Sequence, residues 1–92
     1  MRKILVIESD EDLLNELNTF LQQIHYEVLY STNGASGVQQ ALQHSPDLIL
    51  CNAEVEGLSG YEVFDMLRQM NATSVIPFVF LTTKKKYEEV KN

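Results

Sequence analysis

Four short apolar runs alternate with segments whose apolar residues recur every three or four positions, and this alternation most limits the possible folds. The runs occupy residues 3–7, 26–30, 48–51 and 76–81. The first run, which is almost continuously apolar, is typical of a strand buried on both faces of a sheet; the third also indicates a buried strand, and the other two indicate strands. Strands that alternate with helices form right-handed βαβ units. The sequence therefore predicts an α/β fold with a doubly wound parallel sheet.

The segments between the predicted strands have the periodicity of amphipathic helices. Ser9 or Asp10 is suited to cap the first helix, because both side chains accept hydrogen bonds from backbone N–H groups. Asn33-Gly34 marks a turn before the second helix, and the third is predicted to begin near Gly60. The residues expected to face the sheet are Leu13, Leu14, Leu17, Phe20, Leu21 and Ile24 in the first helix, Ala35, Val38, Ala41 and Leu42 in the second, and Tyr61, Phe64, Leu67 and Met70 in the third.

Length, charge and cysteine content narrow the class of protein. A chain of 92 residues with 45% hydrophobic residues has enough material for one domain, so residues 1–92 are expected to form a single unit. The net charge of −6 argues against a nucleic-acid partner, and no apolar run approaches the length of a membrane span. The single cysteine, Cys51, lies inside an apolar run and predicts a buried thiol in a reducing, cytoplasmic compartment.

Polar residues follow three of the predicted strands, where a parallel sheet places its ligand crevice. Residues 8–10 (Glu, Ser, Asp) follow the first strand, Asn52 and Glu54 follow the third, and Thr82 and Thr83 follow the fourth. The first strand is not followed by a Gly-rich turn, and its loop is acidic, which argues against a nucleotide or a flavin phosphate. The arrangement suits a hard divalent cation or a hydrogen-bonded polar cluster.

Four sequence motifs at these positions resemble the receiver domain of bacterial response regulators, over nearly the whole chain. They are KILVIESDEDLL at the first strand, PDLILCN at the third, EGLSGYEVFDMLR in the loop and helix that follow, and IPFVFLTT at the fourth strand. The resemblance implies a flavodoxin-like parallel sheet with strand order 2-1-3-4. It also implies a role in two-component, or phosphorelay, signalling.

The chemistry of that family needs an Asp that accepts a phosphoryl group, two acids that hold Mg²⁺, and a hydroxyl and a Lys that bind the phosphoryl oxygens. Matched to this chain, the acid pair falls on Glu8 and Ser9, the acceptor on Asn52 and the hydroxyl on Thr82. A neutral carboxamide cannot serve as an anionic nucleophile, and a serine is a poor substitute for a carboxylate. Thr83 stands where the family usually has a small residue. The resemblance thus implies a pseudo-receiver.

In this interpretation Glu8, Ser9, Asp10 and Glu54 form a vestigial acidic pocket, and Thr82 and Thr83 are vestigial switch hydroxyls. Asn52 is expected to bridge the loop ends by hydrogen bonds. No metal or other cofactor is expected, with Glu8 as a weak candidate for binding Mg²⁺.

We therefore expect a non-catalytic domain that binds another protein or an output domain of the same protein. The alternative is an unusual receiver that still binds Mg²⁺ and accepts or senses a phosphoryl group. The acceptor would then be Asn52 after deamidation, or a serine such as Ser9 or Ser59.

The resemblance also bears on the end of the chain. The family has a fifth strand, which carries the Lys, and a last helix, whereas residues 84–91 are predicted only to begin the helix before them. The chain is thus expected to be a fragment or a shortened domain whose fourth strand is an edge. A chain of this length is expected to form a homodimer, exchange elements between copies or bind a partner, which would cover the apolar surface beside its first helix.

Overall fold

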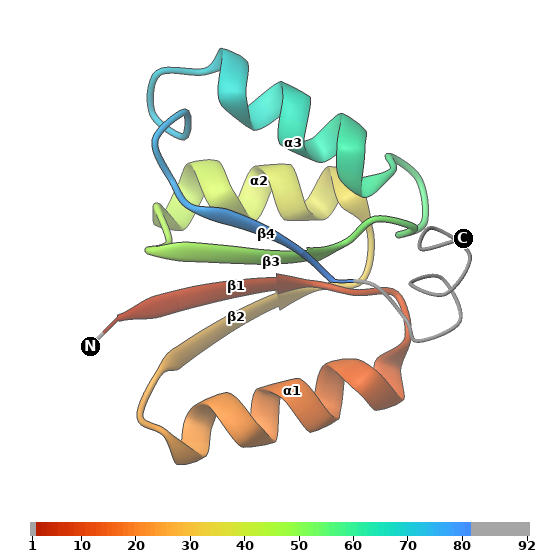
Figure 1. Cartoon of the computed structure of the whole chain (residues 1–92), viewed down its shortest axis with the longest axis vertical. Helices are drawn as coiled ribbons and strands as arrows, with labels where there is room; N and C mark the ends of the chain where they lie inside the picture. Colours follow the sequence, from red (N-terminus) through yellow and green to blue (C-terminus); the bar gives the residue numbers. More distant parts are fainter. Residues whose placement is uncertain (1, 82–92) are drawn as a thin grey trace, which may run out of the picture.

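One parallel sheet with strand order β2-β1-β3-β4 organises residues 2–81, the part of the chain that this computed structural model describes (Figure 1). Neighbouring strands are parallel throughout, so the predicted fold class and strand order are confirmed. The predicted helix over residues 84–91 lies outside the described residues. The strands are β1 Lys3–Ile7, β2 Glu27–Ser31, β3 Leu48–Asn52 and β4 Phe78–Leu81.

Three helices cover the two faces of the sheet in the described part of the chain. Helix α1 (Glu11–Gln23) lies on one face, and α2 (Gly34–His44) and α3 (Gly60–Gln69) lie together on the other (Figure 1). Each helix follows one strand and precedes the next, which is the expected βαβ arrangement. The loops after β1 and β3 consequently meet at one edge of the sheet.

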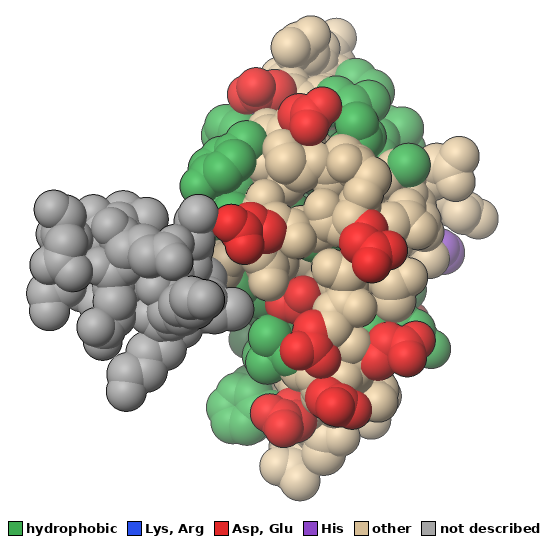
Figure 2. Space-filling model, turned by 90° about the vertical axis from the view of Figure 1, so that its right-hand side faces the viewer, with side chains coloured by type: hydrophobic (Ala, Val, Ile, Leu, Met, Phe, Trp, Pro, Cys, Tyr) green, Lys and Arg blue, Asp and Glu red, His purple; other side chains and the backbone are tan. Residues whose placement is uncertain are grey.

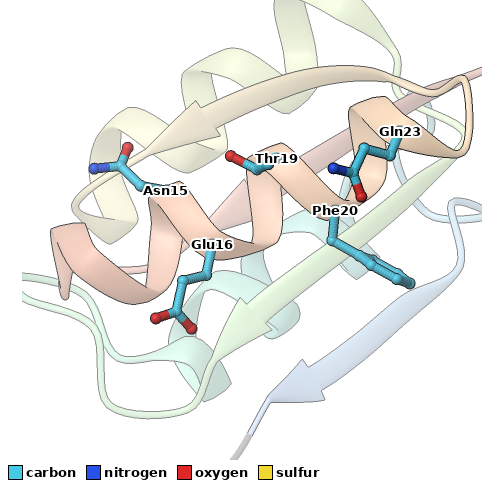
Figure 3. Close-up of a pocket in the computed structure, with 5 residues that line it drawn as sticks. All are labelled: Asn15, Glu16, Thr19, Phe20 and Gln23. Atoms are coloured by element: carbon cyan, nitrogen blue, oxygen red, sulfur yellow. The ribbon is translucent and has the colours of Figure 1, made fainter.

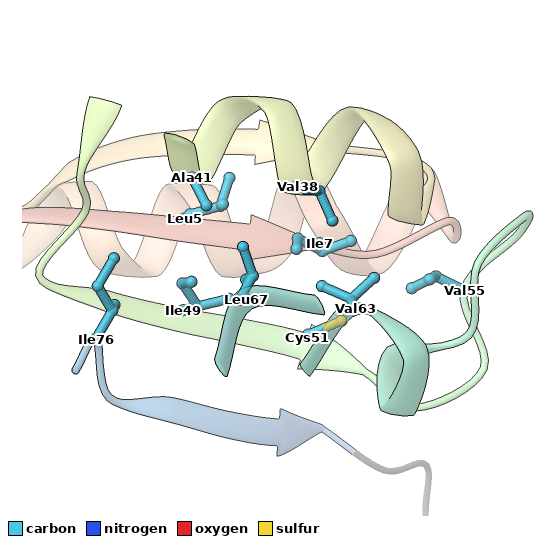
Figure 4. Packing of buried hydrophobic residues seen from close by; sticks show 10 residues of the cluster. All are labelled: Leu5, Ile7, Val38, Ala41, Ile49, Cys51, Val55, Val63, Leu67 and Ile76. Carbon is cyan, nitrogen blue, oxygen red and sulfur yellow. The ribbon is translucent and has the colours of Figure 1, made fainter. Parts of the chain in front are cut away.

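The side chains of β1 alternate between two apolar cores, as the period of two in a strand requires. Leu5 and Ile7 pack with α2 and α3 in the larger core, which also contains the fully buried Cys51 (Figure 4). Ile4 and Val6 pack on the opposite face against Leu14 and Leu21 of α1. The prediction of a buried Cys51 is confirmed.

Several residues predicted to face the sheet are exposed instead, so the predicted stripes were too wide. Helix α3 directs Val63 and Leu67 into the core, whereas Tyr61 lies about 200° from Val63 around the helix and reaches only the edge strand β4. Its ring packs against that of Phe80, with the centroids 5.0 Å apart. Five residues were predicted wrongly: Ala35 is exposed, and the exposed fractions of the larger four are 58% for Phe20, 47% for Ile24, 43% for Leu42 and 59% for Tyr61.

The connection from α3 to β4 differs from the predicted strand, which began at Ile76. The N–H of Ile76 donates to the carbonyl oxygen of Thr73, and Pro77 has no N–H, so the strand begins at Phe78. Arg68 holds this connection by donating to the carbonyl oxygens of Ser74 (2.7 Å) and Ile76 (2.8 Å).

Candidate functional site

The register of the sheet brings Glu8 and Asn52 together. Ile7 of β1 lies opposite Cys51 of β3, so the residues that follow them, Glu8 directly after β1 and Asn52 at the end of β3, lie side by side. Nδ2 of Asn52 donates to both carboxylate oxygens of Glu8, at 2.8 Å to Oε1 and 3.2 Å to Oε2. The carboxylate belongs to a residue that is only 1% exposed. We call this contact the Asn52–Glu8 bridge.

The orientation of the Asn52 amide is fixed by its two neighbours. Its Oδ1 accepts from the backbone N–H of Glu54 at 2.9 Å, while its NH₂ group faces the carboxylate. A flipped amide would put oxygen against oxygen and N–H against N–H, which leaves both groups unsatisfied. Asn52 thus makes the hydrogen bonds between loop ends that the sequence predicted.

Further hydrogen bonds connect Glu8 to the loops on either side. Its Oε2 accepts from the backbone N–H of Asp10 at 3.2 Å, and its own N–H donates to the carbonyl oxygen of Ser31, at the end of β2, at 2.9 Å. The loop after β2 is tied to the loop after β3 through the N–H of Gly34, which donates to the carbonyl oxygen of Glu56. Backbone and side-chain bonds therefore hold three loops in one arrangement.

The other residues of the predicted acidic pocket lie around the bridge, and Asp10 and Glu54 donate backbone N–H groups to it. Asp10 caps α1, because its Oδ1 accepts from the N–H groups of Asp12 and Leu13. Glu54 has an exposed side chain and contributes its backbone N–H to Asn52. Ser9 lines an open hollow of about 440 Å³. Thr82 and Thr83 lie outside the described residues.

Acidic side chains dominate the face formed by these loops (Figure 2). The residues that line the hollow combine carboxylates and hydroxyls, from all three loops and the start of α1. They are Ser9, Asp10, Glu11, Asp12, Thr32 and Glu56.

Two polar residues of this edge were not identified from the sequence as parts of the site. Ser31 supplies the carbonyl oxygen that holds Glu8, and Asn33 caps α2 by accepting from the N–H of Ser36 at 2.9 Å. Asn33 had been assigned to a turn with Gly34. An Asn directly before an amphipathic helical segment is also a capping signal, and that signal identifies its role.

The side chains at the end of β1 and β3 do not fit a Mg²⁺ ion. Mg²⁺ requires oxygen ligands in near-octahedral geometry. Here both oxygens of Glu8 accept hydrogen bonds, and the group of Asn52 that faces them is a nitrogen donor. Within residues 2–81, no three His, Cys, Asp or Glu side chains are placed to hold a metal ion together.

A second hollow of about 440 Å³ lies along the outer side of α1, with the side chains of Glu16 and Phe20 directed to the same side of the helix (Figure 3). The other residues that line it are Asn15, Thr19 and Gln23. Glu16 is the ionisable side chain among the residues that line it. In the described part of the chain, no hydrogen bond joins these residues to the Asn52–Glu8 bridge. We assign it no part in the site.

Comparison with known proteins identifies the family. Residues 4–92 match the model of the response regulator receiver domain, and the chain belongs to this family. It is 32% identical over 84 residues to protein PilH of Pseudomonas aeruginosa, an alignment that covers 91% of this chain and 69% of PilH. It is 30% identical over 91 residues to the response regulator ArlR of Staphylococcus saprophyticus, with 98% of this chain and 40% of ArlR covered. The chain thus spans less than half of ArlR.

Solved receiver structures have the same fold. The receiver domain of the sensor histidine kinase PA1611 from Pseudomonas aeruginosa, solved with a magnesium ion in its active-site cleft, superposes with a TM-score of 0.88 at 22% identity, covering 99% of this chain and 75% of that one. The chemotaxis response regulator CheY4 of Vibrio cholerae gives 0.88 at 22% identity, covering 99% and 76%. The family match and the similarity to PilH make this chain a receiver domain of the two-component signalling type, and the structures share its fold. In the described part, none of the helices is long and apolar enough to cross a membrane.

Proposed function

We propose that this chain is a pseudo-receiver: a non-catalytic signalling domain that acts by binding another protein or an output domain, without phosphorylation of an Asp. The observation that carries the proposal is the Asn52–Glu8 bridge. Asn52 occupies the end of β3, where the family has its phosphate-accepting Asp, and its amide is already paired with a buried carboxylate.

The chemistry of an amide supports this proposal. A carboxylate attacks a phosphoryl group with a charged oxygen lone pair, whereas the oxygen of a carboxamide is neutral. The oxygen of Asn52 also accepts the N–H of Glu54, so one of its two lone pairs is engaged within the loop. In this proposal the domain catalyses no reaction and requires no cofactor.

The partner is then a protein, not a nucleic acid or a membrane. The net charge of −6 and the acidic face at the loops would repel phosphate backbones and anionic lipids. The protein partner can also be a second copy of this chain, bound as a homodimer or by exchange of elements. A reduced thiol at Cys51 supports a cytoplasmic location.

The test is exposure of the longest natural chain that contains these residues to acetyl phosphate with Mg²⁺, followed by acid quenching and intact mass measurement. A receiver domain that retains its acceptor Asp is labelled in the same reaction, which verifies the phosphoryl donor. We expect the adduct on that control and none on this chain. An adduct on this chain that maps to Asn52, Ser9 or Ser59 would overturn the proposal in favour of an unusual phosphate-accepting receiver.

A second measurement addresses recognition of the phosphoryl group without transfer. Beryllofluoride, which mimics an aspartyl phosphate, is titrated in the presence of Mg²⁺ while backbone amide signals are followed by NMR. We expect no saturable shifts at Glu8, Asn52 or Glu54. Saturable shifts there would mean that the crevice senses a phosphoryl-like ligand, and the proposal would be wrong.

A further inference from the structure

We infer that the Asn52 amide takes over the mechanical role of a divalent cation in this crevice, so that the loop arrangement requires neither Mg²⁺ nor phosphate. The inference deepens the proposed function and rests on it for the role of the loop face. It follows from the misfit between the side chains at this edge and a Mg²⁺ ion.

The negative charge of Glu8 has to be compensated inside the protein. Glu8 is buried, and a buried carboxylate needs a partner that donates hydrogen bonds or carries positive charge. The described bases lie elsewhere, since Arg2 and Lys3 are at the opposite edge of the sheet and Arg68 is engaged with backbone carbonyls. Among residues 2–81, the donors that reach the Glu8 carboxylate are the Asn52 amide and the N–H of Asp10.

The Asn52 amide also connects strand ends, as a bound cation would. A cation bound at such an edge joins strand ends because ligands from several loops share it. The Asn52 amide does the same with hydrogen bonds, because its nitrogen binds the end of β1 and its oxygen binds the loop after β3. Glu8 extends the connection to β2 through the carbonyl oxygen of Ser31. One neutral side chain thus joins the end of β1 to the loop after β3, and the backbone N–H of Glu8 joins this pair to the end of β2.

Replacing one atom of Asn52 would remove the hydrogen bonds to Glu8. In Asn52→Asp, an oxygen replaces the nitrogen that lies 2.8 Å and 3.2 Å from the Glu8 oxygens. Two carboxylates at this distance repel unless a proton or a cation lies between them. The variant therefore needs the cation that the natural chain does without.

The experiment measures thermal midpoints of unfolding in Mg²⁺ and in a chelator at matched ionic strength. The chains are the wild type, Asn52→Asp, Asn52→Ala and Asn71→Asp, which adds the same charge at an exposed residue far from the crevice. We expect Asn52→Ala to lower the midpoint by roughly 6–24 °C, as loss of a charge-assisted hydrogen bond implies for a small domain. We expect Asn52→Asp to be lowered further in chelator and raised saturably by Mg²⁺, while Asn71→Asp responds to Mg²⁺ as the wild type does.

Three results would overturn the inference. One is an Asn52→Asp response to Mg²⁺ no larger than that of Asn71→Asp. Another is a wild-type midpoint that rises with Mg²⁺ and loses this response in Glu8→Gln, because a cation would then already bind at Glu8. The third is an Asn52→Ala midpoint equal to that of the wild type, since the bridge would then hold nothing. Asn52→Ala and the wild type keep the test decisive even if Asn52→Asp fails to fold.

These outcomes are independent of the phosphorylation test, because they involve no phosphoryl donor. If the wild type accepts phosphate, the proposed function fails whatever the midpoints show. If only the midpoints contradict expectation, the domain remains a pseudo-receiver whose loops are held by other contacts.

Discussion

Gly60, at the start of α3, lies directly against the backbone of Asn52. A Cβ atom placed on Gly60 would be 2.5 Å from the carbonyl oxygen of Asn52 and 2.8 Å from Cα of Ala53. The N–H of Gly60 also donates to the carbonyl oxygen of Ala53 at 2.9 Å. The close approach of α3 therefore sets the backbone position from which the Asn52 amide reaches Glu8.

Replacement of Gly60 by alanine is expected to destabilise the domain by about 1–3 kcal/mol, the usual range for overpacking. The atoms in the way are backbone atoms, so they can yield only if Asn52 moves. Urea unfolding gives the free energy, and the NMR signals of the Asn52 NH₂ group report its displacement. Gly57→Asn is the control for a side chain added without a clash, because no described atom lies within 4 Å of a Cβ on Gly57; its φ of +78° strains an added side chain, which Asn bears better than most residues, so a smaller loss is expected. Equal stability of Gly60→Ala and Gly57→Asn would contradict the close packing.

The sequence predicted either Ser9 or Asp10 as the cap of α1, and the structure shows that the cap is Asp10. Asp10 accepts from two backbone N–H groups in the first turn, at 3.0 Å and 3.2 Å. We expect Asp10→Ala to lower the free energy of unfolding by about 1 kcal/mol. Ser9→Ala is expected to change it by less than about 0.5 kcal/mol. Denaturant midpoints measure both, and a larger loss for Ser9→Ala would show that the serine caps the helix.

The strands and the fold could be predicted because each strand is a short, mostly apolar run, which is a local signal, although the edge strands β2 and β4 are partly exposed. The inward faces of the helices could be predicted only in part. The large aromatic Tyr61 suggested one face of α3, but the helix packs through Gly60 and Val63, since small residues allow it to lie close to the sheet. Helix α1 contacts the sheet along a narrow line that buries Leu14 and Leu21, which leaves Phe20 exposed.

The site shows a similar division. Polar residues after strand ends identified Glu8 and Asn52 separately, because all carboxyl ends of a parallel sheet meet at one edge. Their direct contact depends on the register that sets Ile7 opposite Cys51. Register arises from the packing of whole strands, so no short motif in the sequence encodes it.

Arg68 offers a test of how the α3–β4 connection is held. Its Nη1 donates to two carbonyl oxygens, and its guanidinium lies 4.8 Å from the centre of the Phe64 ring. A lysine cannot reproduce both the planar stack and the paired bonds, so Arg68→Lys is expected to cost about 1–2 kcal/mol in urea unfolding. Arg2→Lys, at an exposed arginine, is the matched control and should be nearly neutral. If both variants lost the same free energy of unfolding, the contacts of Arg68 would contribute nothing specific to the α3–β4 connection.

Cys51 couples the core to the site, because its side chain is buried and its Sγ donates to the carbonyl oxygen of Asn52 at 3.4 Å. Burial raises the pKa of this thiol from 9.0 to about 12, and the negative charge of Glu8 adds to the effect. The thiol of the folded domain therefore stays protonated at neutral pH. Because the thiolate is the reactive form, alkylation of the native chain should be far slower than that of the chain in denaturant.

The same pKa difference predicts how stability depends on pH. The unfolded chain loses the thiol proton near pH 9.0, whereas the folded chain keeps it until about pH 12. Between these values the folded state binds more protons, so the free energy of unfolding contributed by Cys51 falls as pH rises. Urea unfolding across this range, in the wild type and in Cys51→Ala, isolates the contribution, because both chains share every other titrating group. The wild type should lose stability more steeply with pH than Cys51→Ala; parallel curves would mean that the folded thiol has its ordinary pKa.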